Sequence, residues 1–227
     1  MKMNSIGENL LSVKEKILEA SEVSLMCKQA VNLVAVSKTK PVEAIIEAYE
    51  VGQRVFGENK VQEALSKFTD LKQEKADIEL HLIGPLQTNK AKEAVAVFDV
   101  IQSVDRPKLV TILAKEMKKQ DRWVDCFIQV NTGEEEQKAG VLPVDLDELI
   151  AMCRKEELPV VGLMCIPPVD EEAALHFSFL YELAKQHDLP RISMGMSGDF
   201  EKAIRFGATD VRVGSSIFGN RNYTNGP

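Results

Sequence analysis

The chain has 227 residues, of which 44% are hydrophobic and 28% are charged, a balance typical of a globular protein and not of a disordered one. Its formal net charge of -7 argues against a nucleic-acid-binding protein, because affinity for a phosphate backbone comes mostly from clustered lysines and arginines. β/α barrels of this length commonly form one domain, so we expect residues 1–227 to make a single domain.

The amino-terminal segment, MKMNSIGENLLSVKEKILEA, places charged residues among its apolar positions and never reaches the uninterrupted apolar stretch of a signal peptide or membrane helix. We therefore expect an amphipathic helix in a cytoplasmic protein with no membrane partner. Neither disulfides nor a metal site is expected, because the cysteines lack CxxC spacing and the histidines are scattered singly. These residues are Cys27, Cys126, Cys153, Cys165, His81, His176 and His187.

Beyond this helix, short β-branched runs alternate with longer segments of helical periodicity, a pattern typical of parallel strands joined by crossover helices. Strands are predicted at 32–37, 54–57, 79–83, 100–103, 124–130, 160–165, 191–196 and 210–214. Helices are predicted at 42–51, 60–72, 89–98, 107–120, 145–156, 171–187 and 199–206. No strand is polar enough for an exposed sheet edge, so the eight strands predict an α/β fold that closes as a (β/α)8 TIM-type barrel. Residues 220–227 are expected to form a frayed tail.

Small or polar residues follow nearly every predicted strand at its carboxyl end. In a parallel barrel these ends converge on one rim, which is where ligands bind. The alternative is that β/α turns attract such residues for conformational reasons alone. Helix starts are also predicted from local signals: Pro41 and Pro107 suit first helical turns, and Asp199 suits a helix cap.

Lys38 ends the apolar run NLVAVS, where desolvation would lower the pKa of its amine. A less protonated amine is a better nucleophile toward a carbonyl, which is what a Schiff base requires. The alternative is a lysine that only extends along the strand end toward solvent. Lys40 has the same strand parity, but Pro41 follows it, so we expect Lys40 to be leaving the barrel mouth already.

The loops after the last two strands predict a phosphate site. Ser197 and Gly198 lie where the seventh strand meets a helix start, and Gly214 and Ser215 directly follow the eighth strand. Free N–H groups at a helix start and small side chains suit a phosphate, and these two loops are the usual phosphate position in barrels. Arg212 alternates with valines in the last strand and should face away from them, toward either a structural ion pair or a heteroaromatic nitrogen of a ligand.

Together these residues resemble one known family. The motifs are VAVSKTKP, FGENKVQEA, HLIGPLQTNK, SVDR, QVN with Glu135, Lys138 and Gly140 beyond it, GLMCIP, ISMGMSGDFEKAI and VRVGSSIFG. They resemble the pyridoxal phosphate homeostasis proteins over most of the chain. The resemblance implies a barrel similar to the amino-terminal domain of alanine racemase, with pyridoxal 5′-phosphate in Schiff-base linkage to Lys38.

The resemblance also implies the roles of other residues. Ser197, Gly214 and Ser215 would hold the phosphate, Arg212 would face the pyridine nitrogen, and Asn59 would lie near the ring. The family more often has threonine where this chain has Ser215, but the hydroxyl is kept.

The resemblance further implies a role in intracellular vitamin B6 homeostasis, and we expect a monomeric carrier that hands the cofactor to pyridoxal phosphate-dependent apoenzymes. Arg212 cannot give a proton to the ring nitrogen, and none of Tyr49, Tyr181 and Tyr223 is expected to supply a catalytic acid. One alternative is a pyridoxal phosphate-dependent amino-acid racemase that uses Lys38 as its base. Another is a regulatory module that binds a partner protein through its outer helices.

Overall fold

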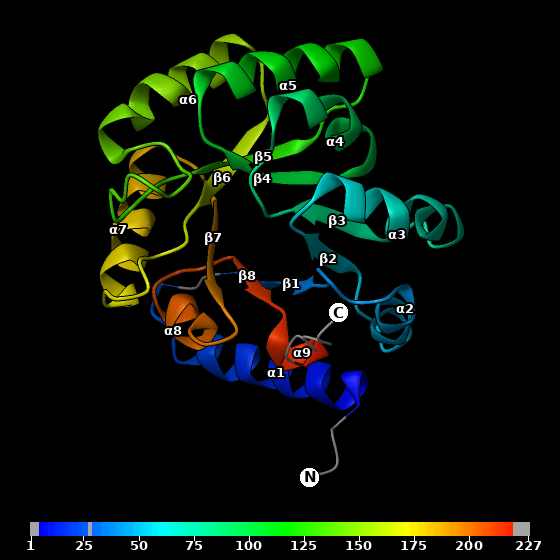
Figure 1. Cartoon of the computed structure of the whole chain (residues 1–227). Helices are drawn as coiled ribbons and strands as arrows, with labels where there is room; N and C mark the ends of the chain where they lie inside the picture. The colour runs from blue at the N-terminus through cyan, green and yellow to red at the C-terminus, as the bar shows by residue number, and fades with distance from the viewer. Residues whose placement is uncertain (1–4, 27–28, 220–227) are drawn as a thin grey trace, which may run out of the picture.

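Each strand of the computed structural model pairs in parallel with the next, and β8 pairs with β1, so the eight strands close into the predicted barrel (Figure 1). The strands are β1 (Asn32–Val36), β2 (Val55–Glu58), β3 (Glu79–Leu82), β4 (Val100–Val104), β5 (Asp125–Gln129), β6 (Val160–Met164), β7 (Arg191–Met196) and β8 (Asp210–Val213). The structure describes residues 5–26 and 29–219. The tail predicted at 220–227 lies outside them, as do Cys27 and Tyr223.

Helices surround this barrel (Figure 1). They are α1 (Ile6–Glu22), α2 (Val42–Glu50), α3 (Val61–Glu74), α4 (Ala91–Val97), α5 (Pro107–Gln120), α6 (Leu146–Lys155), α7 (Ala173–Gln186), α8 (Phe200–Arg205) and the short α9 (Ser215–Phe218), with 3-10 turns η1 (Thr88–Lys90) and η2 (Pro143–Asp145). The turn η2 and the helix α9 were not predicted, because three or four residues carry no helical periodicity. Within the described ranges, no helix combines the length and apolar character needed to cross a membrane.

The predicted helix starts are partly confirmed. Pro107 occupies the first turn of α5, whereas Pro41 lies one position earlier, at the N-cap of α2. Asp199 is at the N-cap of α8, as predicted, but its side chain makes no capping hydrogen bond to the helix. Its carboxylate instead accepts the backbone N–H of Met196 at 2.6 Å, because the side chain turns back toward the end of β7. This bond closes the turn that carries Ser197.

Side chains alternate between two environments along each strand. Val211 and Val213 belong to the large apolar core between the strands and the helices, so Arg212 between them faces the interior of the barrel, as predicted. The same alternation directs Val100, Phe127 and Met164, which form a separate small apolar cluster, to the inside. The barrel interior therefore contains both apolar and charged side chains.

Helix α1 lies along the outside of the barrel, next to α8 and α9 (Figure 1). It begins with a capping box in which Ser5 and Glu8 satisfy each other's backbone N–H groups. The side chain of Asn9 donates to the carbonyl of Ile217 at 3.0 Å. The first helix thus fixes the last one, which follows β8 directly.

Gly84 marks a close approach of backbone segments at the carboxyl ends of β2 and β3. A Cβ atom placed on Gly84 would lie 2.3 Å from the carbonyl oxygen and 2.8 Å from the Cα of Asn59. Backbone atoms cannot move aside as a flexible side chain can. We predict that Gly84→Ala lowers the free energy of unfolding by about 1–3 kcal/mol in urea denaturation, as overpacking does.

Gly198→Ala is the matched control, because a Cβ atom there would meet nothing within 4 Å. We expect it to change the free energy of unfolding by less than about 0.5 kcal/mol. Equal effects of the two substitutions would show that the approach of Gly84 to Asn59 is not a structural constraint.

Candidate functional site

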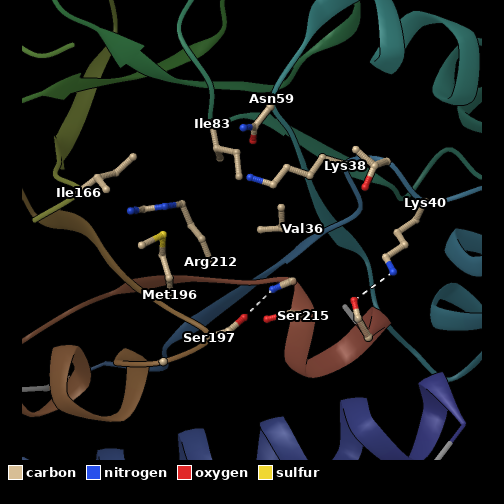
Figure 2. A pocket seen from close by; sticks show the side chains of 14 residues that line it. Val36, Lys38, Lys40, Asn59, Ile83, Ile166, Met196, Ser197, Arg212 and Ser215 are labelled. Carbon is tan, nitrogen blue, oxygen red and sulfur yellow. Dashed lines mark hydrogen bonds between the residues drawn. The ribbon is translucent and has the colours of Figure 1, made fainter. Parts of the chain in front are cut away.

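A pocket of about 440 Å³ opens at the carboxyl ends of the strands. All six residues named from the sequence line it, and they come from four different strand ends: Lys38, Asn59, Ser197, Arg212, Gly214 and Ser215. Figure 2 shows these side chains around one space, with Asn59 and Ile83 on one side and Ser197 and Ser215 on the other. The contacts that each of them makes with a ligand remain a prediction.

The charge of this pocket is opposite to that of the whole chain. Its ionisable lining residues are Lys38, Lys40 and Arg212, and no carboxylate lines it in the part of the chain that the structure describes, although the sequence has a net charge of -7. Three hydroxyl groups add to the polar lining, those of Thr39, Ser197 and Ser215. An electropositive, partly apolar cavity with hydroxyl groups suits a small organic anion.

Lys38 follows β1 by two residues and is half-buried. Its side chain shares the strand parity of Val36, which also lines the pocket. In Figure 2 its amine points into the pocket, near Ile83. Ser37 faces the opposite way and is fully buried on the helix side of the barrel wall.

The turn that carries Lys38 is held by two side chains of α3. Lys67 donates to the carbonyl of Ser37 at 2.9 Å, and Glu63 accepts the backbone N–H of Thr39. Thr39 has φ 63°, a left-handed conformation that is unfavourable for a β-branched residue and persists only where its surroundings enforce it. The hydrogen bonds with Glu63 and Lys67 hold the turn in this conformation, so the backbone at Lys38 is fixed from outside the barrel.

Glu58 completes this arrangement as a fully buried carboxyl group. One of its oxygens accepts from Ser37 at 2.7 Å and from Lys67 at 2.9 Å, whereas the other has no hydrogen-bond partner among the described residues. Burial raises the pKa of Glu58, and the bonds from Ser37 and Lys67 only partly offset it. For Glu63, burial also acts to raise the pKa, but the bonds from Lys67 and the Thr39 N–H outweigh it and lower the pKa.

Lys40 does not leave the barrel mouth, so that prediction is wrong. It lines the pocket, as Figure 2 shows, and its amine donates to the carbonyls of Phe218 at 2.7 Å and Gly219 at 3.0 Å. The long side chain reaches the end of α9 even though Pro41 turns the backbone away. Lys40 thereby ties the loop after β1 to the helix that begins with Ser215.

The loops after β7 and β8 are joined by a hydrogen bond. The backbone N–H of Gly214 donates to the hydroxyl of Ser197 at 3.1 Å (Figure 2). A Cβ atom on Gly214 would lie 3.2 Å from the Cβ of Val36 and 3.3 Å from its carbonyl oxygen, so a side chain here would press on the end of β1. The exposed Ser215 follows, and the two serine hydroxyls lie near each other in the pocket.

Arg212 reaches the pocket from inside the barrel and is only 4% exposed. It donates to the hydroxyl of Ser193 at 2.6 Å and to the carbonyl of Cys165 at 2.8 Å. The structural ion pair considered from the sequence is not found in residues 5–26 and 29–219. Burial lowers the pKa of the Arg212 guanidinium. A guanidinium still stays protonated, so the pocket holds a permanent cation.

Sequence reasoning missed several apolar residues of the pocket wall. Ile83 directly follows β3, Ile166 follows β6 by two residues, and Met196 ends β7. Their positions at strand ends are the signal that could have identified them. Together with Val36 they give the pocket an apolar wall facing its cations.

Comparisons with known proteins agree on one family. A family model described as alanine racemase, N-terminal domain, matches residues 9–222. The chain is 38% identical to the pyridoxal phosphate homeostasis protein of Pasteurella multocida (strain Pm70), over 97% of this chain and 99% of that protein. It is 42% identical to the protein of the same name from Aquifex aeolicus (strain VF5), over 95% of this chain and 98% of that protein.

Solved structures are similar over the same extent. PipY of Synechococcus elongatus PCC7942 is known without PLP, with a TM-score of 0.82 and 38% identity, and with PLP bound, with a TM-score of 0.80 and 36% identity. Both comparisons cover 95% of this chain and 100% of PipY. Alanine racemase of Clostridium difficile 630 has a TM-score of 0.73 at 12% identity and shares the fold, over 97% of this chain and 58% of that one.

The raised pKa of Glu58 predicts a pH dependence of stability. Because the folded-state pKa lies above the unfolded value, the stabilisation from the bound proton is complete below the unfolded pKa of 4.5 and is lost as pH rises through the folded pKa. Each unit of pKa difference corresponds to about 1.4 kcal/mol. Glu58→Gln removes this titration, so the stability of the wild type relative to the variant should fall as pH rises above 4.5.

Urea denaturation of both proteins between acidic and neutral pH measures this difference, and other titrating groups cancel in the comparison. Stability curves that stay parallel over the whole range would contradict the prediction.

Proposed function

The chain belongs to the family of pyridoxal phosphate homeostasis proteins, and we propose that it binds pyridoxal 5′-phosphate through a covalent link to Lys38. The observation that carries the proposal is the charge of the pocket: three cations and no described carboxylate surround a cavity with an apolar wall. When bound, pyridoxal phosphate supplies an aldehyde, a phosphate ester and a pyridine nitrogen. Each of these groups has a chemically matched partner in the pocket.

The phosphate ester fits the loops after β7 and β8. Ser197 and Ser215 offer hydroxyl groups, and Gly214 offers a backbone N–H in a place where any side chain would press against Val36. Small residues and backbone donors are what a close approach to phosphate requires. We assign these three residues to the phosphate.

The ring fits the remainder of the lining. Arg212 donates hydrogen bonds and cannot take up or release a proton, so it suits an unprotonated ring nitrogen. Asn59 lies at the edge of the pocket where a ring could contact it, and Ile83 and Ile166 supply apolar contacts.

We further propose that the protein holds and hands over the cofactor without strong catalysis. A pyridoxal phosphate enzyme needs an acid or base beside the substrate, and the described lining contains no tyrosine, histidine, aspartate or glutamate. Tyr49 lies on α2 and donates to Asp77 at 2.6 Å, and Tyr181 lies on α7 against Gly207.

The physiological role in this proposal is vitamin B6 homeostasis in the cytoplasm. The acceptors would be pyridoxal phosphate-dependent apoenzymes, and residues 1–227 would act as one monomeric binding domain. The full-length similarity to proteins named for pyridoxal phosphate homeostasis supports this role.

Lys38→Ala tests the covalent link. We expect the wild type, after incubation with pyridoxal phosphate and borohydride reduction, to carry the cofactor on one peptide containing Lys38, and the variant to lose this label while remaining folded. Lys40→Ala should keep the label on Lys38, because the Lys40 amine bonds carbonyls of α9. Peptide mass spectrometry locates the label, and a unique label on another lysine in Lys38→Ala would overturn the assignment.

A racemase is the second candidate function, because the chain shares the fold of alanine racemase and Lys38 could act as a single base. Incubation with single L-amino acids in deuterium oxide separates the two functions. A carrier should exchange the α-proton no faster than free pyridoxal phosphate does. Sustained exchange well above that rate, lost in Lys38→Ala, would establish the enzyme.

A further inference from the structure

A chain of hydrogen bonds crosses the interior of the barrel behind the pocket. Arg212 on β8 donates to Ser193 on β7 at 2.6 Å, and Ser193 donates to Gln102 on β4, also at 2.6 Å. Gln102 contacts the Nδ1 of His81 on β3 at 2.8 Å, and the Nε2 of His81 contacts Glu79 at 2.6 Å. These hydrogen bonds thus link the pocket to the opposite end of the barrel, where Glu79 begins β3.

The direction of every bond in this chain follows from its end groups. A guanidinium only donates, so the Ser193 hydroxyl accepts from Arg212 and its own proton goes to the Gln102 carbonyl oxygen. The Gln102 amide then presents its NH2 group to the Nδ1 of His81, which must accept. The proton of His81 is therefore on Nε2 and is donated to the Glu79 carboxylate.

Burying this chain is costly unless all of its groups are paired. Ser193, Gln102 and His81 are 0% exposed, and apolar side chains of similar size would fill a barrel interior without any such requirement. Within the described residues Arg212 has no ion pair, although the negative charges of Asp199 and Asp210 act on it electrostatically. The bond from His81 lowers the pKa of Glu79, which keeps the far end of the chain anionic.

We propose that Ser193, Gln102 and His81 are positioning residues that hold the Arg212 guanidinium toward a bound ring. This inference rests on the proposed function. Ser193 fixes one terminal nitrogen of Arg212 and the Cys165 carbonyl fixes the other, so the guanidinium keeps one orientation and its remaining N–H donors stay available to the pocket. If the bond from Ser193 to Gln102 is removed, the Ser193 hydroxyl is free to rotate, and its oxygen no longer holds the Arg212 guanidinium in one orientation.

Two glutamines provide a matched pair for the test. Gln102 is a central member of the hydrogen-bonded chain. Gln53 is also buried, but its side chain donates to the carbonyls of Leu33 and Val55 at 2.7 Å, and none of its described hydrogen bonds reaches Ser193, Gln102 or His81. Gln53→Leu and Gln102→Leu both leave buried polar groups unpaired, so both should lower the melting temperature. Only Gln102→Leu should change the binding of pyridoxal phosphate.

The measurements are the dissociation constant for pyridoxal phosphate and the absorption band of the bound cofactor. For Gln102→Leu we expect roughly tenfold weaker binding and a shifted absorption band. A tenfold change in affinity is about the contribution of one hydrogen bond to a charged group. Gln53→Leu should match the wild type in both. Borohydride should still label Lys38 in both variants, because the covalent link does not depend on Arg212.

Ser193→Ala keeps the inference testable if Gln102→Leu does not fold, since it removes a single oxygen atom next to Arg212 and should weaken binding and shift the band in the same way. An unchanged band and affinity in Ser193→Ala, or equal changes in the two glutamine variants, would overturn the positioning role. A wild-type protein without any label on Lys38 would instead overturn the proposed function.

Discussion

The pairing of β1 with β8 is the contact on which the site depends. Asn32 pairs with Asp210 and Ala35 pairs with Val213, and this register brings the carboxyl ends of the first and last strands side by side. Lys38 and Ser215 are far apart in sequence, and the closing register places them at one rim. A shift of one residue would turn Arg212 out of the barrel and Val213 into it, because side chains alternate strictly along a strand.

Much of this architecture could be predicted from the sequence, for identifiable reasons. The predicted boundaries of the eight strands and the seven helices between them lie within two residues of the observed ones, because hydrophobic periodicity is strong in parallel strands buried on both faces. Among the pocket residues named from the sequence, Lys38, Ser197, Gly214 and Ser215 were named because they follow strand ends, and Arg212 because it breaks the apolar alternation. Asn59 was named from the family resemblance alone. What each residue contacts depends on neighbours distant in sequence, so the placement of Lys40 was predicted wrongly.

The polar chain inside the barrel shows the limit of that reasoning. Ser193, Gln102 and His81 lie in three different strands, and a single polar residue in a strand is weak evidence for any role. Their meaning comes from contacts across the barrel, since β7 and β4 are not neighbours in the sheet. Glu58 and Lys67 are similar, because their importance for the turn at Lys38 becomes visible only when α3 packs on β2.

The bond from Lys40 to the end of α9 has a consequence for the entropy of ligand binding. Lys38 and Lys40 are two residues apart, so a single short loop carries the amine that we propose to be reactive and also restrains the helix of Ser215. In the proposed site, the residues for the aldehyde and for the phosphate are then part of one preorganised unit, whose spacing is set before any ligand arrives. A preorganised site loses little conformational freedom on binding, so more of the contact energy appears as affinity.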